Sequence, residues 1–109
     1  IGTMKSINCL FVSSNRLSRL PQEIGLLSSL RECEFFNNSI ATLPAEIGLL
    51  TQLNDLNISR NQLTDLPSEI LQLTRLCAFD LGFNRLQVIP PPLIQMNWVV
   101  KLNLSHNSL

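Results

Sequence analysis

Few residues in this chain could act as an acid, a base or a nucleophile, and the sequence does not group them into a catalytic set. His106 is the only histidine. A histidine that acts as a general base needs a substrate proton within hydrogen-bond reach and a second group that orients its ring. The residues at the same phase of the 23-residue repeat described below, Arg60 and Phe83, are unsuited to that role. We therefore expect no enzymatic activity from this chain.

The cysteines and glycines also give no indication of a bound metal or cofactor. Cys9, Cys33 and Cys77 have neither the short paired spacing of a zinc site nor the C-x-x-C spacing of a redox pair. Three cysteines without a disulfide pattern favour a reducing compartment. The glycines lack the spacing of phosphate-binding and dinucleotide-binding loops. We expect no metal site and no cofactor.

The composition narrows the remaining classes of function. The chain has 109 residues, the size of one domain, with 22 leucines and 11 asparagines. Eight acidic residues balance eight basic ones, so net positive charge does not predict a nucleic-acid partner. Neither a signal peptide nor an apolar run of the roughly 18 residues that span a membrane is apparent. The strands and helices that position the side chains must therefore be predicted from the spacing of the leucines and asparagines.

Asparagine and proline recur along the chain with one fixed period. Asparagine returns every 23 residues, at Asn15, Asn38, Asn61, Asn84 and Asn107. Proline follows the same step after an apolar residue, at Pro21, Pro44, Pro67 and Pro90. With units starting at residues 7, 30, 53, 76 and 99, the same seven positions of each unit are apolar, and Cys33 is the one small exception. A fixed period of this length is typical of a solenoid.

Each unit predicts one short strand, one turn and one return segment. Apolar residues at positions 4 and 6 alternate with outward positions 3 and 5, the pattern of a strand with one buried face. The asparagine that follows is expected to be buried, with its amide bonded to backbone groups of the turn. The return opens with proline, usually with glutamate two residues later, which suits a short helix. The sequence Pro90-Pro91-Pro92 predicts a more extended return in the fourth unit.

The unit at residues 53–75 reads L-N-D-L-N-I-S-R-N-Q-L-T-D-L-P-S-E-I-L-Q-L-T-R and resembles the leucine-rich repeat. The resemblance extends over the whole chain. It implies an α/β, right-handed solenoid with a parallel β-sheet on the concave face and short helical or extended returns on the convex face. We expect one domain, with a partial repeat at 1–6, repeats at 7–29, 30–52, 53–75 and 76–98, and a partial repeat at 99–109. Neither end has a polar capping unit, so we expect a longer array; the alternative is end-to-end pairing with a second copy.

The outward positions of successive strands form columns roughly 5 Å apart and define the candidate binding face. Four carboxylates fall there, and their mutual repulsion favours a basic partner surface over a purely structural role. Three phenylalanines also fall at outward positions, where the alternative is local packing against a neighbouring repeat. The predicted partner-binding residues are Phe11, Glu32, Glu34, Phe36, Asp55, Asn57, Arg60, Asp80, Phe83, Lys101 and Asn103. Trp98 is instead interpreted as covering the edge between two units, and the alternative is a binding role.

The segments Leu20–Gly25 and Leu43–Gly48, L-P-x-E-I-G, are similar to the intracellular Ras-group class of leucine-rich repeats. That resemblance implies a cytoplasmic scaffold in small-GTPase signalling, with a Ras-like small GTPase or a phosphatase as partner. It transfers no specific contact residue, because only the framework matches.

Three other functions remain open at this stage. Arrays of very similar pattern occur in bacterial pathogens as secreted or cell-surface proteins that bind host molecules. Alternatively, the repeats are the targeting arm of a multidomain phosphatase, kinase or cyclase. An inert spacer in a long solenoid would lose no partner when its sheet face is changed.

Overall fold

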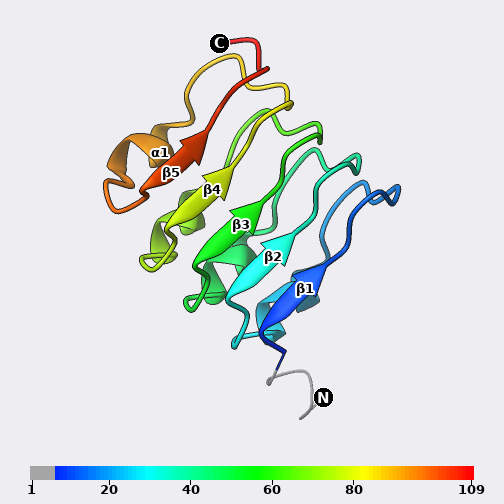
Figure 1. Cartoon of the computed structure of the whole chain (residues 1–109), viewed down its shortest axis with the longest axis vertical. Helices are drawn as coiled ribbons and strands as arrows, with labels where there is room; N and C mark the ends of the chain where they lie inside the picture. Colours follow the sequence, from blue (N-terminus) through cyan, green and yellow to red (C-terminus); the bar gives the residue numbers. More distant parts are fainter. Residues whose placement is uncertain (1–6) are drawn as a thin grey trace.

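The computed structural model describes residues 7–109, so the predicted partial repeat at 1–6 lies outside the described residues. One parallel sheet runs through the molecule in the order β1-β2-β3-β4-β5 (Figure 1). Its strands are β1 (Cys9–Phe11), β2 (Glu32–Glu34), β3 (Asp55–Asn57), β4 (Ala78–Asp80) and β5 (Lys101–Asn103). Neighbouring strands pair in register with the sequence period, as in the pairing of Leu56 with Phe79. The chain is therefore a leucine-rich-repeat solenoid, as the sequence predicts.

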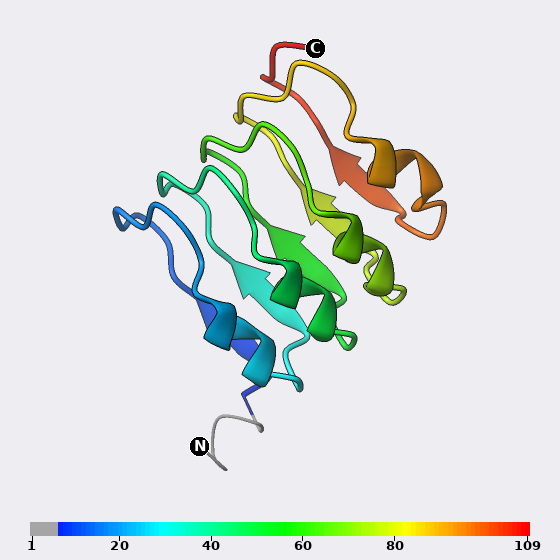
Figure 2. The same cartoon turned by 180° about the vertical axis from the view of Figure 1, so that it is seen from behind.

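The return segments form a second layer behind the sheet (Figure 2). Three of them are short 3-10 helices, η2 (Gln22–Leu26), η3 (Ala45–Leu49) and η4 (Ser68–Gln72). Each follows a proline in extended conformation and carries glutamate in its first turn. Proline has no N–H to leave unbonded at this end of a helix, and glutamate there complements the exposed backbone N–H groups. The expected short helical returns are confirmed for these three units.

The prediction of an extended fourth return is wrong. Residues Pro91–Gln95 form α1, the one α-helix in the described part of the chain. Pro90 precedes the helix, with φ −55° and ψ 130°, while Pro91 and Pro92 occupy the first turn. The first N–H groups of an α-helix have no partner within the helix, and the proline ring already holds φ near the helical value. A proline run at this place therefore starts a helix instead of preventing one.

A single apolar core fills the space between the sheet and the returns. It contains the repeated leucine and isoleucine positions together with Phe35 and Phe79, which are both almost fully buried. Cys33 is buried in the same layer, and this burial, with a smaller contribution from Cys9, raises the pKa of its thiol to about 12. Trp98 packs against the core, and its Nε1 donates a hydrogen bond to the carbonyl of Leu73 at 3.0 Å. Trp98 thus joins adjacent units, as its predicted covering role requires.

The repeated asparagines connect neighbouring turns through their side-chain amides. Asn61 is 7% exposed, and its Nδ2 donates to the carbonyls of Phe35, Ile58 and Ser59 while its Oδ1 accepts from the N–H of Ile40. Equivalent bonds are made at Asn38, Asn84 and Asn107.

Asn15 does not share this environment, which corrects its assignment to the buried series. It is exposed, and its amide donates to the carbonyl of Ser13 at 3.1 Å. In the other units the asparagine also donates to a carbonyl 26 residues earlier, and within residues 7–109 Asn15 makes no such bond.

Candidate functional site

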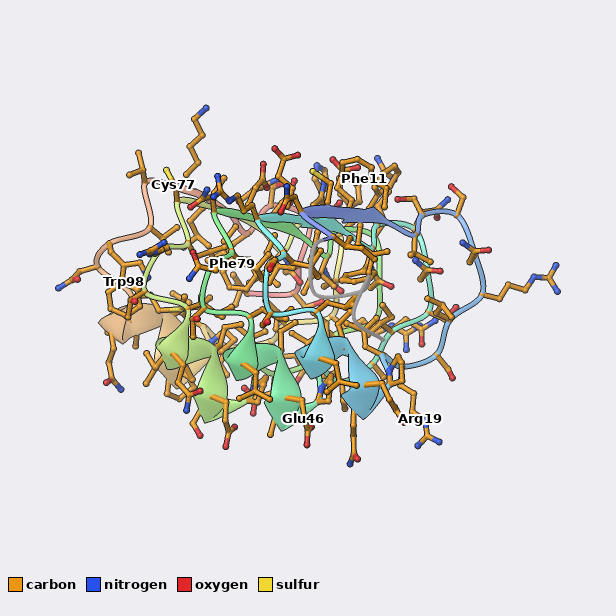
Figure 3. All side chains as sticks on the ribbon, turned by 90° about the horizontal axis from the view of Figure 1, so that it is seen from below. Phe11, Arg19, Glu46, Cys77, Phe79 and Trp98 are labelled. Atoms are coloured by element: carbon orange, nitrogen blue, oxygen red, sulfur yellow. The ribbon has the colours of Figure 1, made fainter. Side chains whose placement is uncertain are left out.

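The outward strand residues lie in two columns on the open surface of the sheet. In-register pairing places Glu32 beside Asp55 and Asn57 beside Asp80. Phe11 projects from this surface, whereas Glu46 and Arg19 project from the opposite, helical side (Figure 3). We call the surface formed by residues at positions 3, 5, 7 and 8 of the repeats the sheet face. It contains all eleven residues of the predicted partner-binding set.

Three acidic side chains and one lysine line a shallow hollow on this face. The hollow has a volume of about 490 Å³, and its polar lining comes from Glu34, Asp55, Asn57, Asp80, Lys101 and Asn103. Glu32 lies at the next register position to Asp55, about one strand spacing away. The lining carries three carboxylates and only one ammonium group, that of Lys101, so its net charge is negative and the hollow favours a cationic group from outside. The structure thus brings together three of the four predicted carboxylates around one depression and places the fourth at its border.

Three residues of the predicted set also stabilise the turns that follow the strands. The Oδ1 of Asn57 accepts from the backbone N–H and the hydroxyl of Ser59, at 3.0 and 2.7 Å. Asp80 likewise accepts from the N–H of Gly82 at 2.9 Å. Asn103 repeats this local bond with Ser105 and donates its amide to Asp80 at 3.1 Å. An asparagine or aspartate that bonds backbone two residues later forms an Asx turn, and this spacing was readable from the sequence.

Position 8 of each unit has a backbone conformation that the repeat pattern does not predict. The φ angle is positive at Ser14, Asn37, Arg60, Phe83 and His106, with values between 55° and 62°. These residues are left-handed at the point where the chain leaves the sheet and turns toward the buried asparagine. Left-handed backbone is well tolerated by asparagine and glycine and is unfavourable for bulky side chains.

Three of these left-handed residues form a stack across successive repeats. The guanidinium carbon of Arg60 lies 4.0 Å from the ring centre of Phe83. The Phe83 and His106 rings stack with centres 4.0 Å apart and planes 13° from parallel. The sequence alone predicts Phe83 as a separate exposed aromatic and predicts no role for His106. The signal that could have found the stack is the occurrence of arginine, phenylalanine and histidine at one phase of the repeat.

The three outward phenylalanines differ in their surroundings. Phe11 is 57% exposed on the sheet face, and Phe83 is 37% exposed within the stack. Phe36 is half-buried, so local packing accounts for part of its side chain. Cys9 and Cys77 are free and exposed. The exposure of the side chain therefore supports a binding role most strongly for Phe11 and least for Phe36.

Within residues 7–109 there is no cluster of three or more histidine, cysteine, aspartate or glutamate residues that could hold a metal ion. In the same part of the chain no helix has the length and hydropathy needed to cross a membrane.

A family model described as leucine-rich repeat matches residues 51–109. The chain belongs to the leucine-rich-repeat family. Members of this family typically act as protein-interaction modules, and the fold is generally a binding scaffold without catalytic activity. A comparison with curated protein sequences finds no significant match.

Solved leucine-rich-repeat structures superpose on this chain over most of its length. A leucine-rich-repeat protein of Leptospira interrogans is 36% identical, with a TM-score of 0.81 over 85% of this chain and 24% of that protein. An internalin (inlF) of Listeria monocytogenes is 23% identical, with a TM-score of 0.81 over 94% and 29% of the two chains, and shows the fold alone. A plant peptide hormone receptor, RGFR1 in complex with RGF2, is 29% identical, with a TM-score of 0.82 over 97% and 18%. This chain thus spans less than a third of the length of each of them.

Proposed function

We propose that this chain is a recognition module whose sheet face binds a basic surface of a partner protein. The observation that carries the proposal is the group of carboxylates at the hollow. Asp80 uses its Oδ1 for bonds within the protein, whereas no hydrogen bond within residues 7–109 involves the carboxylates of Glu32, Glu34 or Asp55. Lysine or arginine side chains of a partner would relieve the repulsion between Glu32 and Asp55 and would pair with all three groups.

For its setting, we propose a cytoplasmic scaffold in small-GTPase signalling. The supporting observation is the repeated L-P-x-E-I-G motif at Leu20–Gly25 and Leu43–Gly48. On the convex side, the proline of each motif precedes a short helix, η2 or η3. The proposed partner is a Ras-like small GTPase or a phosphatase. The exposed free thiols of Cys9 and Cys77 agree with a reducing compartment.

A second candidate setting has its own support. The bacterial structures of Leptospira and Listeria superpose on this chain as well as the plant receptor does, and the Leptospira protein has the highest identity of the three. In this alternative the module belongs to a secreted or cell-surface protein, and its sheet face binds a host protein. The chemistry of the sheet face is the same in both settings, and only the source of the partner differs.

The test compares three matched forms of the protein as affinity baits. The first is the wild type, and the second carries Glu32→Lys, Glu34→Lys and Asp55→Lys on the sheet face. The third carries the same number of charge reversals on the convex side, at Glu23, Glu46 and Glu69. Asp80 is left unchanged because its bonds to Gly82 and Asn103 support the strand ends. Circular dichroism and thermal melting first establish that both variants keep the fold.

Each bait captures proteins from two sources, a eukaryotic cell lysate and a preparation of host-cell surface proteins. The expected result is a partner that binds the wild type and the convex variant and is lost from the sheet-face variant. Calorimetry with the purified partner then gives the affinity, and a fall of at least about tenfold is expected for the sheet-face variant. Equal binding to all three baits would refute the assignment of the sheet face. The source that yields the partner separates the cytoplasmic setting from the cell-surface one.

A further inference from the structure

The Arg60–Phe83–His106 stack places bulky side chains where the backbone favours small or amide ones. All three residues have positive φ, at 57°, 55° and 55°. Asparagine, which occupies the same place at Asn37, adopts this conformation at lower cost than arginine or phenylalanine. Strained backbone of this kind is concentrated at sites that bind or react. The side chains of the stack are therefore candidates for a role that the turn itself does not require.

The stack presents hydrogen-bond donors at both ends of an aromatic ring. The guanidinium carbon of Arg60 lies over the Phe83 ring. Guanidinium groups stack on aromatic faces, and in a stacked arrangement the N–H groups point sideways and not into the ring. The imidazole of His106, from the next repeat, lies nearly parallel to the Phe83 ring, so its ring N–H also points sideways. Arg60 and His106 each lie 4.0 Å from the Phe83 ring centre, so the stack offers a donor group from each of the two neighbouring repeats.

The geometry points to a carboxylate of the partner as the group that the stack receives. A carboxylate matches the planar fork of arginine and accepts two parallel hydrogen bonds from it. A second cation would be repelled by Arg60, and a purely apolar group would leave the sideways N–H groups without acceptors. A phosphate is disfavoured because its larger negative charge would face Glu34, Asp55 and Asp80 on the same surface.

The carboxylate site is continuous with the acidic hollow. Asp80 lines the hollow and holds the N–H of Gly82, the residue directly before Phe83. A partner segment that crosses the ends of the strands thus meets the hollow and then the stack. The matching segment is an extended peptide with a basic residue over the hollow and an acidic residue over the stack. Because both sites are fixed on one sheet face, the basic and the acidic residue of the peptide should be separated by one fixed number of residues.

This inference rests on the proposed function, and its test is chosen so that the two can fail separately. A phage-displayed library of random octapeptides is selected against the wild type and against four variants. Arg60→Gln and Phe83→Asn alter the stack, and the double variant Glu34→Lys, Asp55→Lys alters the hollow. Arg85→Gln is the matched control, because Arg85 is an exposed arginine at position 10, outside the sheet face. Melting curves verify that each variant is folded.

The expected result is a wild-type consensus with a basic and an acidic residue at one fixed spacing. Arg60→Gln and Phe83→Asn lose the acidic preference and keep the basic one, the hollow variant does the reverse, and Arg85→Gln changes neither. A basic preference without an acidic one, or an acidic preference that survives Arg60→Gln, overturns the inference and leaves the proposed function standing. The absence of any consensus that depends on the sheet face overturns both.

A synthetic peptide from the wild-type selection then measures the contact directly. Replacing its acidic residue by glutamine should weaken binding to the wild type about tenfold, the effect of losing one charge-assisted hydrogen bond. The same replacement should have little effect on binding to Arg60→Gln, because the two groups act as a pair. A phosphoserine version should bind more weakly than the acidic peptide. Equal losses in both proteins, or tighter binding of phosphoserine, would contradict a carboxylate pair at Arg60.

Discussion

Replacement of Asn61 by leucine tests the asparagine bonds that connect the turns. Asn61 is 7% exposed and makes four hydrogen bonds through its amide, three as donor and one as acceptor. Leucine has a similar size and fills the site without leaving a large cavity. The substitution therefore removes the bonds and changes little else in the packing.

The cost depends on which backbone groups lose their last partner. The carbonyls of Phe35, Ile58 and Ser59 each keep a second bond, from Asn38, Asn84 and the N–H of Asn37 respectively. The N–H of buried Ile40 bonds only to Asn61 among the described residues. One unsatisfied buried donor costs about 1–3 kcal/mol, so Asn61→Leu should lower the free energy of unfolding by that amount.

Urea denaturation followed by circular dichroism measures this difference. The control is Asn54→Leu, an exposed asparagine in the same unit, for which a change within about 0.5 kcal/mol is expected. An effect of Asn61→Leu as small as that of the control would refute the role of the amide. A loss well above 3 kcal/mol would show instead that the carbonyls do not keep their second bonds.

Three further predictions concern the sheet face and the core. Phe36→Ala should lower stability by less than the roughly 3–5 kcal/mol of a fully buried phenylalanine, because Phe36 is half-buried; a larger loss in urea denaturation would show that it is a core residue. Phe83→Asn should leave the melting temperature nearly unchanged, because relief of left-handed backbone strain offsets the lost stacking. In the NMR spectrum of this variant, the upfield ring-current shifts of the His106 ring protons should disappear. A thiol alkylating agent at pH 8 should modify Cys9 and Cys77 in the folded protein and Cys33 only after unfolding, because burial raises the pKa of Cys33 to about 12; mass spectrometry showing a third modification before unfolding would contradict this.

On the convex side, the effect of proline depends on its place in the helix. Proline inside a helix is disruptive, and three prolines at Pro90–Pro92 therefore predict an extended segment. The structure places Pro91 and Pro92 in the first turn of α1, where the lack of an N–H costs nothing. Whether these prolines start a helix depends on the direction in which the preceding turn leads the chain into the convex layer.

The repeat period determined the strands, their register and the core from the sequence alone. Each unit has too little apolar surface to fold by itself, so identical spacing forces the units to stack in step, and Leu56 must lie beside Phe79. The buried asparagines follow for the same reason, because each coil leaves the same backbone groups unbonded.

The tertiary structure alone decided how the outward residues are used. Position 8 lies past the strand, where the alternation of inward and outward side chains no longer holds, and its left-handed backbone directs Arg60, Phe83 and His106 onto one another. Asn57, Asp80 and Asn103 bond to the turns beside them, whereas Glu32, Glu34 and Asp55 make no such bonds within residues 7–109. All of these residues are polar or charged and lie at outward positions of the repeat, so the sequence pattern does not distinguish the two groups. Only the path of the backbone after each strand separates the side chains that hold the fold together from those that remain available to a partner.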